Sequence, residues 1–335
     1  MPLVTGGRVR SLVDAAEAER DATRADALVA SADVTLEVTT TYWTLVMARE
    51  RAAVLARGLG RADAVVSDVR SRVDAGLLPP NELLSAQAQR ARQNVQLLES
   101  RNAAAIAEVD LARLVGAGLD QPIATVTPID RPTPGVEALV ESPTAALAAR
   151  ANETRPERLG LVLRQAGLRA SADAAAAVTR PQVVALAAVE PARPNARFVP
   201  RTDDLKTSWD LGVTVTWNLF DGGRARADRA AALAQADALK ARLSDFDARV
   251  AVEIRQRLLD LNSSRAALAA SDAAVAAATE ARRVIGERFG AGVATSTDVL
   301  DADVVVLEAE LERTRVAVTL RLGEARLIRA VGAKQ

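Results

Sequence analysis

The sequence predicts a mainly α protein of long antiparallel coiled-coil helical hairpins with a small antiparallel β-strand insertion. Three observations lead to this fold class. The composition is rich in Ala, Leu, Arg, Asp and Glu and only 2% aromatic, as in long helices and coiled coils. A long segment occurs twice at a constant spacing. One segment near the middle of the chain alternates strictly between apolar and polar residues, which is the period of a β-strand.

The charge balance and the missing residue types exclude several functions. Acidic and basic residues number 43 each, so the chain has no strong field to attract nucleic acid. It contains no cysteine and no histidine, which excludes disulfides and removes the commonest metal ligand and general base. We expect no cofactor, no metal, no catalytic residue and no nucleic-acid partner, and therefore no enzyme.

The acidic residues form no convincing catalytic or metal-binding group. They are scattered along predicted helix faces, where solvated pairing with Arg is the expected role. Asp298, Asp301 and Asp303 come closest to a metal cluster. They stand at a predicted helix start, where the helix dipole favours acids, so we expect no metal there.

The duplication is the strongest feature of the sequence. Gly6 and Gly222 are 216 positions apart and begin similar segments. Convergent Ala-rich helices share composition but not glycine positions, so we infer a true duplication. The same spacing pairs Glu37 with Glu253, Arg72 with Arg288, Gly76 with Gly292, Leu84 with Leu300, Glu108 with Glu324, and Val115-Gly116 with Val331-Gly332.

The first copy is predicted to be a helical hairpin. Its long helix runs from about Arg8 to Asp74, turns at residues 76–80, and returns to about Gly116. A helix of roughly 65 residues is about 100 Å long at ~1.5 Å per residue. Such a rod buries little by itself and must pack along its whole length, and alanine at the seams allows close approach.

The second copy repeats this plan. Asp221 is a candidate N-cap beside the turn-forming Gly222 and Gly223, which correspond to Gly6 and Gly7. Gly292 suits a left-handed C-cap, and Thr295 and Asp298 form a Thr-x-x-Asp helix start. Between Gly223 and Gly292, apolar residues recur at steps of three, four and seven positions, which is the pattern of a coiled-coil seam. Its apolar residues include Leu239, Leu243, Phe246, Val250, Ile254, Leu258 and Leu261.

The segment between the copies is predicted to hold a connector, a helix and two strands. Residues 120–143 are rich in Pro and Thr and read as an irregular connector. A helix from about Pro143 to Val178 follows, interrupted at Arg155-Pro156. The first strand covers residues 182–189, and a polar loop with three prolines covers residues 190–207.

The second strand carries the pattern of a membrane barrel. One face is apolar and bounded by tryptophans, and the other is small and polar, as in outer-membrane strands. The apolar face consists of Trp209, Leu211, Val213, Val215, Trp217 and Leu219. The two tryptophans are about 26 Å apart along a strand, close to the height of an apolar membrane band. A soluble hairpin with one buried face is the alternative, but it would more often place Lys or Glu on its wet face.

The motifs at the turns resemble those of the TolC family of outer-membrane factors. The segments 288–293 and 297–302 are similar to the family's helical-tip motif, and 72–77 with 82–86 is a second match. The segment 219–224 is similar to the family's strand-to-helix turn. The resemblance covers nearly the whole chain. It divides the chain into 3–119 (first repeat), 120–180 (connector and helix), 181–219 (barrel strand pair with an extracellular loop) and 220–335 (second repeat).

The resemblance implies a passive export duct. Three protomers of this family close a twelve-stranded transmembrane β-barrel in the outer membrane, and their helices continue as an α-helical tunnel (an α-barrel) in the periplasm. The tips meet a periplasmic adaptor and an inner-membrane pump or ABC transporter of an efflux or type I secretion system, for small molecules or proteins. The residues expected at these docking tips are Arg72, Gly76, Glu82, Arg288, Gly292 and Asp298.

Compared with the family plan, the first copy lacks a counterpart of the helix and strand that precede the second copy. No apolar leader is visible in residues 1–7. We expect a gene product that begins about 90 to 100 residues earlier, with a leader of ordinary length and room for a lipid anchor. In-frame stop codons directly upstream of Met1 would favour a non-functional truncated fragment instead.

A soluble or periplasmic coiled-coil adaptor is the alternative function. Adaptors of this kind usually have one hairpin between small β-domains, whereas this chain has two hairpins around one strand pair. The sequence does not distinguish drug efflux, metal efflux and protein secretion.

Overall fold

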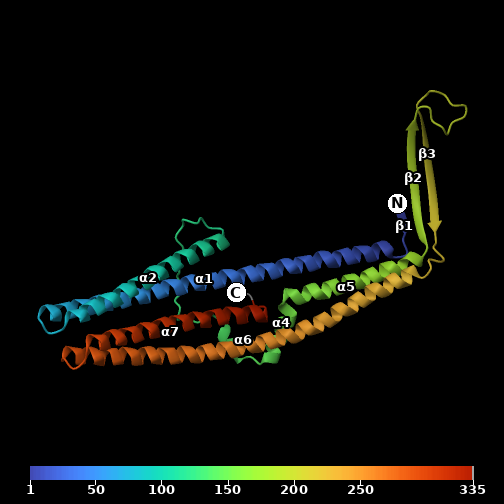
Figure 1. Cartoon of the computed structure of the whole chain (residues 1–335). Helices are drawn as coiled ribbons and strands as arrows, with labels where there is room; N and C mark the ends of the chain where they lie inside the picture. The colour runs from blue at the N-terminus through green and yellow to red at the C-terminus, as the bar shows by residue number, and fades with distance from the viewer. Residues whose placement is uncertain (334–335) are drawn as a thin grey trace. The chain divides into compact units, whose positions relative to one another are not determined.

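The long helices and the single small sheet follow one another along the chain in a computed structural model, which describes residues 1–333 (Figure 1). The last two residues of the predicted second repeat, 334–335, lie outside the described residues. The elements in chain order are β1 (Pro2–Val4), α1 (Arg8–Asp74), α2 (Pro80–Val115), α3 (Val136–Glu141), α4 (Thr144–Thr154), α5 (Pro156–Ala176), a short 3-10 turn (Ala177–Thr179), β2 (Gln182–Ala192), β3 (Lys206–Thr216), α6 (Arg224–Gly290) and α7 (Ser296–Val331).

The helix boundaries repeat with the spacing of the sequence duplication. Helices α1 and α6 each have 67 residues, and α2 and α7 each have 36. Every start and every end in the second copy lies 216 positions after its counterpart in the first. The predicted fold class, long helical hairpins with a small strand insertion, is confirmed.

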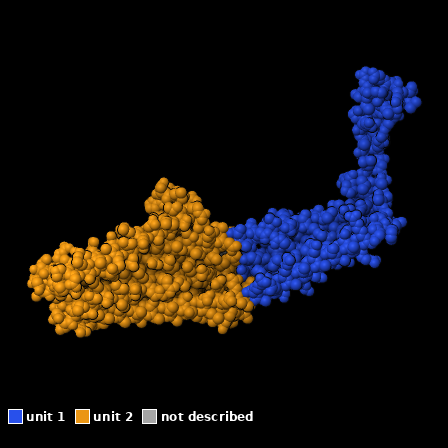
Figure 2. All heavy atoms as spheres, in the orientation of Figure 1, with its two compact units in different colours: residues 1–30, 155–249 blue, residues 31–154, 250–335 orange. Residues whose placement is uncertain are grey.

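The chain forms two compact units (Figure 2). Unit 1 comprises residues 1–30 and 155–249, and unit 2 comprises residues 31–154 and 250–335. Unit 1 therefore contains the sheet, α5 and the beginnings of the two long helices. Unit 2 contains the remainder of both long helices together with α2, α3, α4 and α7. No helix among the described residues combines the length and the apolar character needed to cross a bilayer.

In unit 2 the helices pack through small separate clusters rather than one large core. Near the hairpin turns the buried cluster is Val65, Val69, Ala86, Phe289, Val299 and Leu300. Further along the helices lies a cluster of Val54, Leu55, Leu97 and Leu307. The next cluster is Trp43, Val46, Ile129, Ala317 and Val318. Each cluster joins residues from both copies, so the two hairpins hold each other together along unit 2.

In unit 1, α5 packs against the first part of α1 and of α6. A Cβ atom on Gly167 of α5 would lie 3.4 Å from the Ala15 backbone oxygen, so glycine allows this close approach to α1. On the α6 side, Arg158 donates to both carboxylate oxygens of Asp247 at 2.8 and 3.2 Å. Helix α5 begins after Arg155 with a proline at its first turn, which confirms the predicted interruption.

The connector between α2 and α4 differs from the prediction, because it contains the short helix α3. Two glutamates hold the rest of it. Glu108 accepts a hydrogen bond from the Ile123 backbone N–H at 2.7 Å. Glu324, the duplicated counterpart of Glu108, accepts from the backbone N–H and hydroxyl of Thr133 at 3.2 and 2.6 Å. The irregular segment is therefore bonded to both copies.

The sheet has the order β1-β2-β3 and is antiparallel throughout. Strands β2 and β3 pair without interruption from Gln182 with Thr216 to Ala192 with Lys206. The first strand is thus longer than the predicted 182–189, and the loop is shorter than the predicted 190–207. Asn195 explains this, because its amide nitrogen donates to the backbone oxygens of Glu190 and Lys206 at 3.3 and 2.9 Å and so closes the strand ends.

Candidate functional site

Each long helix ends in a turn of the same geometry. At the first turn, Gly76 has φ +73°, and Leu77 donates its backbone N–H to the Arg72 oxygen at 2.8 Å. At the second, Gly292 has φ +75°, and Val293 donates to the Arg288 oxygen at 2.9 Å. This left-handed C-cap satisfies helix carbonyls and favours glycine, which has no Cβ.

The helices that leave the two turns begin differently. The Thr295 hydroxyl accepts from the Asp298 backbone N–H, and the Asp298 carboxylate accepts from the Thr295 backbone N–H at 2.8 Å, which is a complete capping box. These bonds from Thr295 and the nearby Arg288 charge hold the pKa of Asp298 below its ordinary value. The counterpart of Thr295 in the first copy is Pro79, which makes no side-chain cap.

Two of the predicted tip residues join the hairpins to each other. The Arg72 guanidinium lies 4.2 Å from the centre of the Phe289 ring and donates to the Phe289 backbone oxygen at 3.1 Å. Glu82 accepts a hydrogen bond from the Ser296 hydroxyl. Both contacts cross from the first copy to the second, so they fix one turn against the other.

The other two charged tip residues have a different environment. Arg288 and Asp298 are exposed, and Asp298 is engaged in its own capping box. The structure thus brings Arg72 and Glu82 into contact with the second copy, while their counterparts Arg288 and Asp298 face solvent in this chain. Sequence reasoning missed the partners Phe289 and Ser296. The available signal was that the copies differ there, with Val73 and Pro80 in the first.

A shallow cavity of about 280 Å³ lies between α6 and α7 close to the second turn. Small and aliphatic side chains line it together with Asp298 and Asp301. The lining residues are Ala278, Ala281, Ile285, Asp298, Asp301, Ala302 and Val305. The cavity offers a small apolar surface beside two carboxylates, next to the predicted docking turn.

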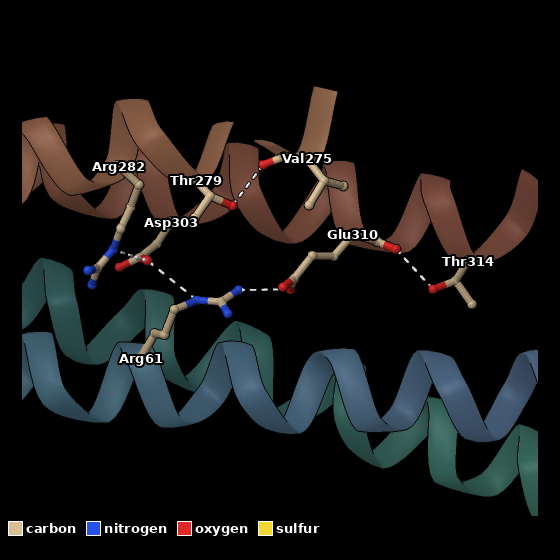
Figure 3. A network of polar contacts seen from close by, with 7 residues as sticks. All are labelled: Arg61, Val275, Thr279, Arg282, Asp303, Glu310 and Thr314. Atoms are coloured by element: carbon tan, nitrogen blue, oxygen red, sulfur yellow. Dashed lines mark hydrogen bonds and ion pairs between the residues drawn. The ribbon is translucent and has the colours of Figure 1, made fainter. Parts of the chain in front are cut away.

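A charged network connects the hairpins further along the helices (Figure 3). Arg282 on α6 donates to Asp303 on α7 at 2.9 Å. Arg61 on α1 lies 3.6 Å from the same Asp303 oxygen and donates to Glu310 at 3.1 Å. The Asp303 side chain is only 4% exposed.

This network corrects the expectation that the acidic residues are solvated. Asp303 is buried between two arginines, and Glu324 is buried beside Arg321, whose Nη1 donates to both of its oxygens at 2.8 Å. Helix periodicity shows only the face of a residue on its own helix and could not reveal these neighbours. Asp298, Asp301 and Asp303 form no metal-type group of three within residues 1–333.

The strand predicted to face lipid is exposed on its apolar side. Trp209, Leu211, Val213 and Val215 are each 64–73% exposed. The opposite side of β3 is exposed as well from Gly212 to Thr216, since no helix covers the sheet there. Strand β3 ends at Thr216, so Trp217 and Leu219 follow the strand instead of belonging to it.

Trp217 is placed by a hydrogen bond rather than by the sheet. Its Nε1 donates to the Thr179 backbone oxygen at 3.0 Å, which ties the segment after β3 to the short turn that follows α5. The predicted strand through Leu219 is therefore wrong in its last residues, because period-two alternation continues past the last backbone pair at Thr216.

The turns into the long helices use equivalent caps. Asp221 accepts from the backbone N–H groups of Gly223 and Ala225 at 2.9 and 2.8 Å. Its counterpart Thr5 accepts from the Val9 backbone N–H at 3.3 Å. Gly6, Gly7, Gly222 and Gly223 all have positive φ, and a Cβ on Gly6 would lie 2.6 Å from the Arg180 Cβ.

We predict that Asp303→Ala destabilises the protein by about 3 kcal/mol, because it leaves arginines without their buried partner. Asp301→Ala is the matched control, since Asp301 is exposed on the same helix two residues away. The measurement is the midpoint of urea unfolding followed by circular dichroism. Equal midpoints for the two variants would show that the network adds no stability.

Comparisons with known proteins agree with this architecture. The outer membrane efflux protein family model matches residues 1–117 and 147–333. A membrane protein crystal structure from Pseudomonas aeruginosa is 22% identical, with a TM-score of 0.82, covering 99% of this chain and 75% of that one. The outer membrane protein VceC from Vibrio cholerae is 21% identical, with a TM-score of 0.79, covering 99% and 78%.

A third solved structure, the open state of the MtrE outer membrane channel of Neisseria gonorrhoeae, has the same fold. It is 18% identical, with a TM-score of 0.80, covering 98% of this chain and 72% of that one. No curated protein sequence matched. The family model spans both helical repeats and the sheet between them. The chain therefore belongs to the outer membrane efflux protein family, and it is an outer-membrane channel protein for passive export.

Proposed function

We propose that the chain is one protomer of a homotrimeric export duct whose helical turns dock a periplasmic adaptor of an inner-membrane pump. The observation that carries this proposal is an imbalance between the two copies. Positions that are buried on α7 have exposed apolar counterparts on α2. A surface of the first copy is thus left without the cover that its duplicate has.

The imbalance follows the duplication residue by residue. Leu84 is 65% exposed, whereas its counterpart Leu300 is 7% exposed. Leu98 is 55% exposed, whereas its counterpart Thr314 is 6% exposed. Helix α7 is covered by α1 of its own chain through Trp43 and Val318. By the same symmetry, α2 is covered by α6 of a second protomer.

Helix α6 carries a matching exposed surface. Leu259 is 53% exposed, whereas its counterpart Trp43 is 7% exposed. Helix α2 of a second protomer, placed on α6, would bury Leu259 as α7 buries Trp43. Repeating a heterologous contact of this kind gives a closed ring when the rotation closes. The family resemblance supplies the number of protomers, three.

We predict that Leu98→Arg weakens trimer formation, because it places a charge in the apolar contact with the second protomer. Gln96→Arg is the control, since Gln96 is exposed and its counterpart Glu312 is exposed too. Analytical ultracentrifugation of the detergent-purified protein measures the trimer fraction. Loss of trimer in both variants, or in neither, would count against this interface.

The strand pair is the proposed membrane segment. Strand β3 presents Trp209, Leu211, Val213 and Val215 on one side and Gly212 and Thr214 on the other. In a barrel the apolar side meets lipid and the small polar side meets water. Trp217 and Leu219, which follow the strand, continue the lipid-facing row at the border of the membrane.

We predict that arginine destabilises the barrel more at Val213 than at the neighbouring Thr214. Val213→Arg should destabilise the barrel by about 2–4 kcal/mol if this position lies near the bilayer midplane. Thr214→Arg should be tolerated, because its side chain would face the water-filled lumen. Folding into outer-membrane lipid vesicles measures both, and equal behaviour would refute the assignment of faces.

The two glycine turns are the proposed docking end. Arg72 and Glu82 already contact α6 and α7 of the same chain. Arg288 and Asp298 are exposed, and Asp298 lines the small-residue cavity. A partner hairpin with a small apolar tip and a basic side chain would fit this cavity and its carboxylates. In this proposal Gly76 and Gly292 keep the turns narrow, so that the partner can enter between the helix pairs.

We predict that Gly292→Val lowers export and cross-linking to the adaptor, while trimer assembly and membrane insertion persist. Valine is strained at φ +75°, which widens the turn. Gly116→Val is the matched control, because Gly116 also ends a helix with φ +70° in open surroundings. Dye efflux and cross-linking yield in cells are the readouts. Normal export by Gly292→Val would mean that the turn is not the docking site.

A further inference from the structure

A cavity of about 530 Å³ lies in unit 2 between α1, α7 and the connector. Its volume falls within the range of small-molecule sites in proteins. Tyr42 and Trp43 form an aromatic wall, with their rings 5.4 Å apart in an edge-to-face arrangement. Ala325 and Ile328 of α7 and two prolines of the connector supply further apolar surface.

The walls of this cavity are held in place by hydrogen bonds. The Tyr42 hydroxyl accepts from the Thr127 backbone N–H at 3.2 Å, which ties the connector to α1. Thr133 donates twice to Glu324, which ties the connector to α7. Arg313 donates to Asp130 at 2.9 Å and adds a third link. The cavity is therefore largely formed before any ligand arrives.

The unused polar side-chain groups around the cavity are donors. The Arg321 side chain is only 4% exposed, and its Nε has no partner among the described residues. The exposed Arg131 makes no side-chain hydrogen bond or ion pair within that part of the chain. The Tyr42 hydroxyl accepts one bond and has its own proton free to donate.

The two acids beside the cavity, Asp130 and Glu324, are already paired, and Asp130 accepts from Arg313 at 2.9 Å. Glu324 accepts from Arg321 on both oxygens and from Thr133 through two donors. With Asp130 paired to Arg313, the guanidinium groups of Arg131 and Arg321 stand against the single carboxylate of Glu324, which leaves the site with an excess of positive charge. A ligand with an anionic oxygen and an apolar body would satisfy the free donors and cover the aromatic wall.

The aromatic pair and the buried arginine occur in one copy only. At the equivalent places of the other copy, Tyr42 and Trp43 are replaced by Leu258 and Leu259, and Arg321 by Ala105. Trp43 also packs against Val318 of α7, but this packing uses neither the Tyr42 hydroxyl proton nor the unpartnered Nε of Arg321.

We propose that this cavity, lined by Tyr42, Trp43, Arg131 and Arg321, binds a small organic carboxylate with an aromatic or short aliphatic body. The carboxylate lies between the Arg131 and Arg321 side chains, and the body lies against the aromatic wall. The site is distinct from the docking turns and does not depend on the proposed adaptor.

Isothermal titration calorimetry of the full chain in nonionic detergent tests this assignment. The probes are 1-naphthoate and octanoate, each with its matched alcohol, naphthalene-1-methanol or octanol. We expect saturable binding of at least one acid, about tenfold tighter than its alcohol because of the charge-assisted hydrogen bonds. The tighter of the two acids then identifies an aromatic or an aliphatic body.

Three variants complete the test. Arg131→Ala should weaken acid binding about tenfold without affecting the fold, and Ala325→Leu should fill the cavity and abolish binding. Arg326→Ala on the same helix is the control, because Arg326 is exposed and does not line the cavity. The proposal is overturned if neither acid binds saturably, if acid and alcohol bind equally, or if Arg131→Ala and Arg326→Ala behave alike.

Discussion

A helix of 67 residues cannot bury its own apolar face, and this constraint governs the rest of the structure. Its stability must come from neighbours along its length, since isolated helices are only marginally stable in water. The chain meets this need with several small clusters, alanine-rich contacts and ion pairs instead of one central core. What remains uncovered, on α2 and α6 and on the sheet, is what a second copy and a lipid bilayer would cover.

The two copies share their backbone plan and differ in how they use charge. Arg61, Arg282, Asp303 and Glu310 join the hairpins within the chain (Figure 3). Their counterparts are Ala277, Val66, Gln87 and Asn94, none of which is charged. The contact inside a chain is thus fastened by buried charges, which cost much to separate once paired. In the proposed trimer, the equivalent contact between protomers would therefore lack these four charges.

The sequence predicted features that local chemistry controls. Glycines with positive φ end the helices at Gly116 and Gly332, and the constant spacing of the duplication predicts each helix boundary of one copy from its counterpart in the other. Features set by partners distant in the sequence were missed. The end of β3 depends on where β2 stops pairing, and the burial of Asp303 depends on Arg61 and Arg282. The cavity at Tyr42 could not be foreseen, because three separate segments form it.

The duplicated glutamates have a mechanical consequence. Glu108 and Glu324 descend from one position but grip different points of a single connector, Ile123 and Thr133. Arg49 strengthens the first grip by bonding both Glu108 and the Ile123 oxygen. The connector therefore links α1 and α2 of the first hairpin to α7 of the second through Ile123 and Thr133. A separation of the two hairpins near these glutamates would first have to break these hydrogen bonds.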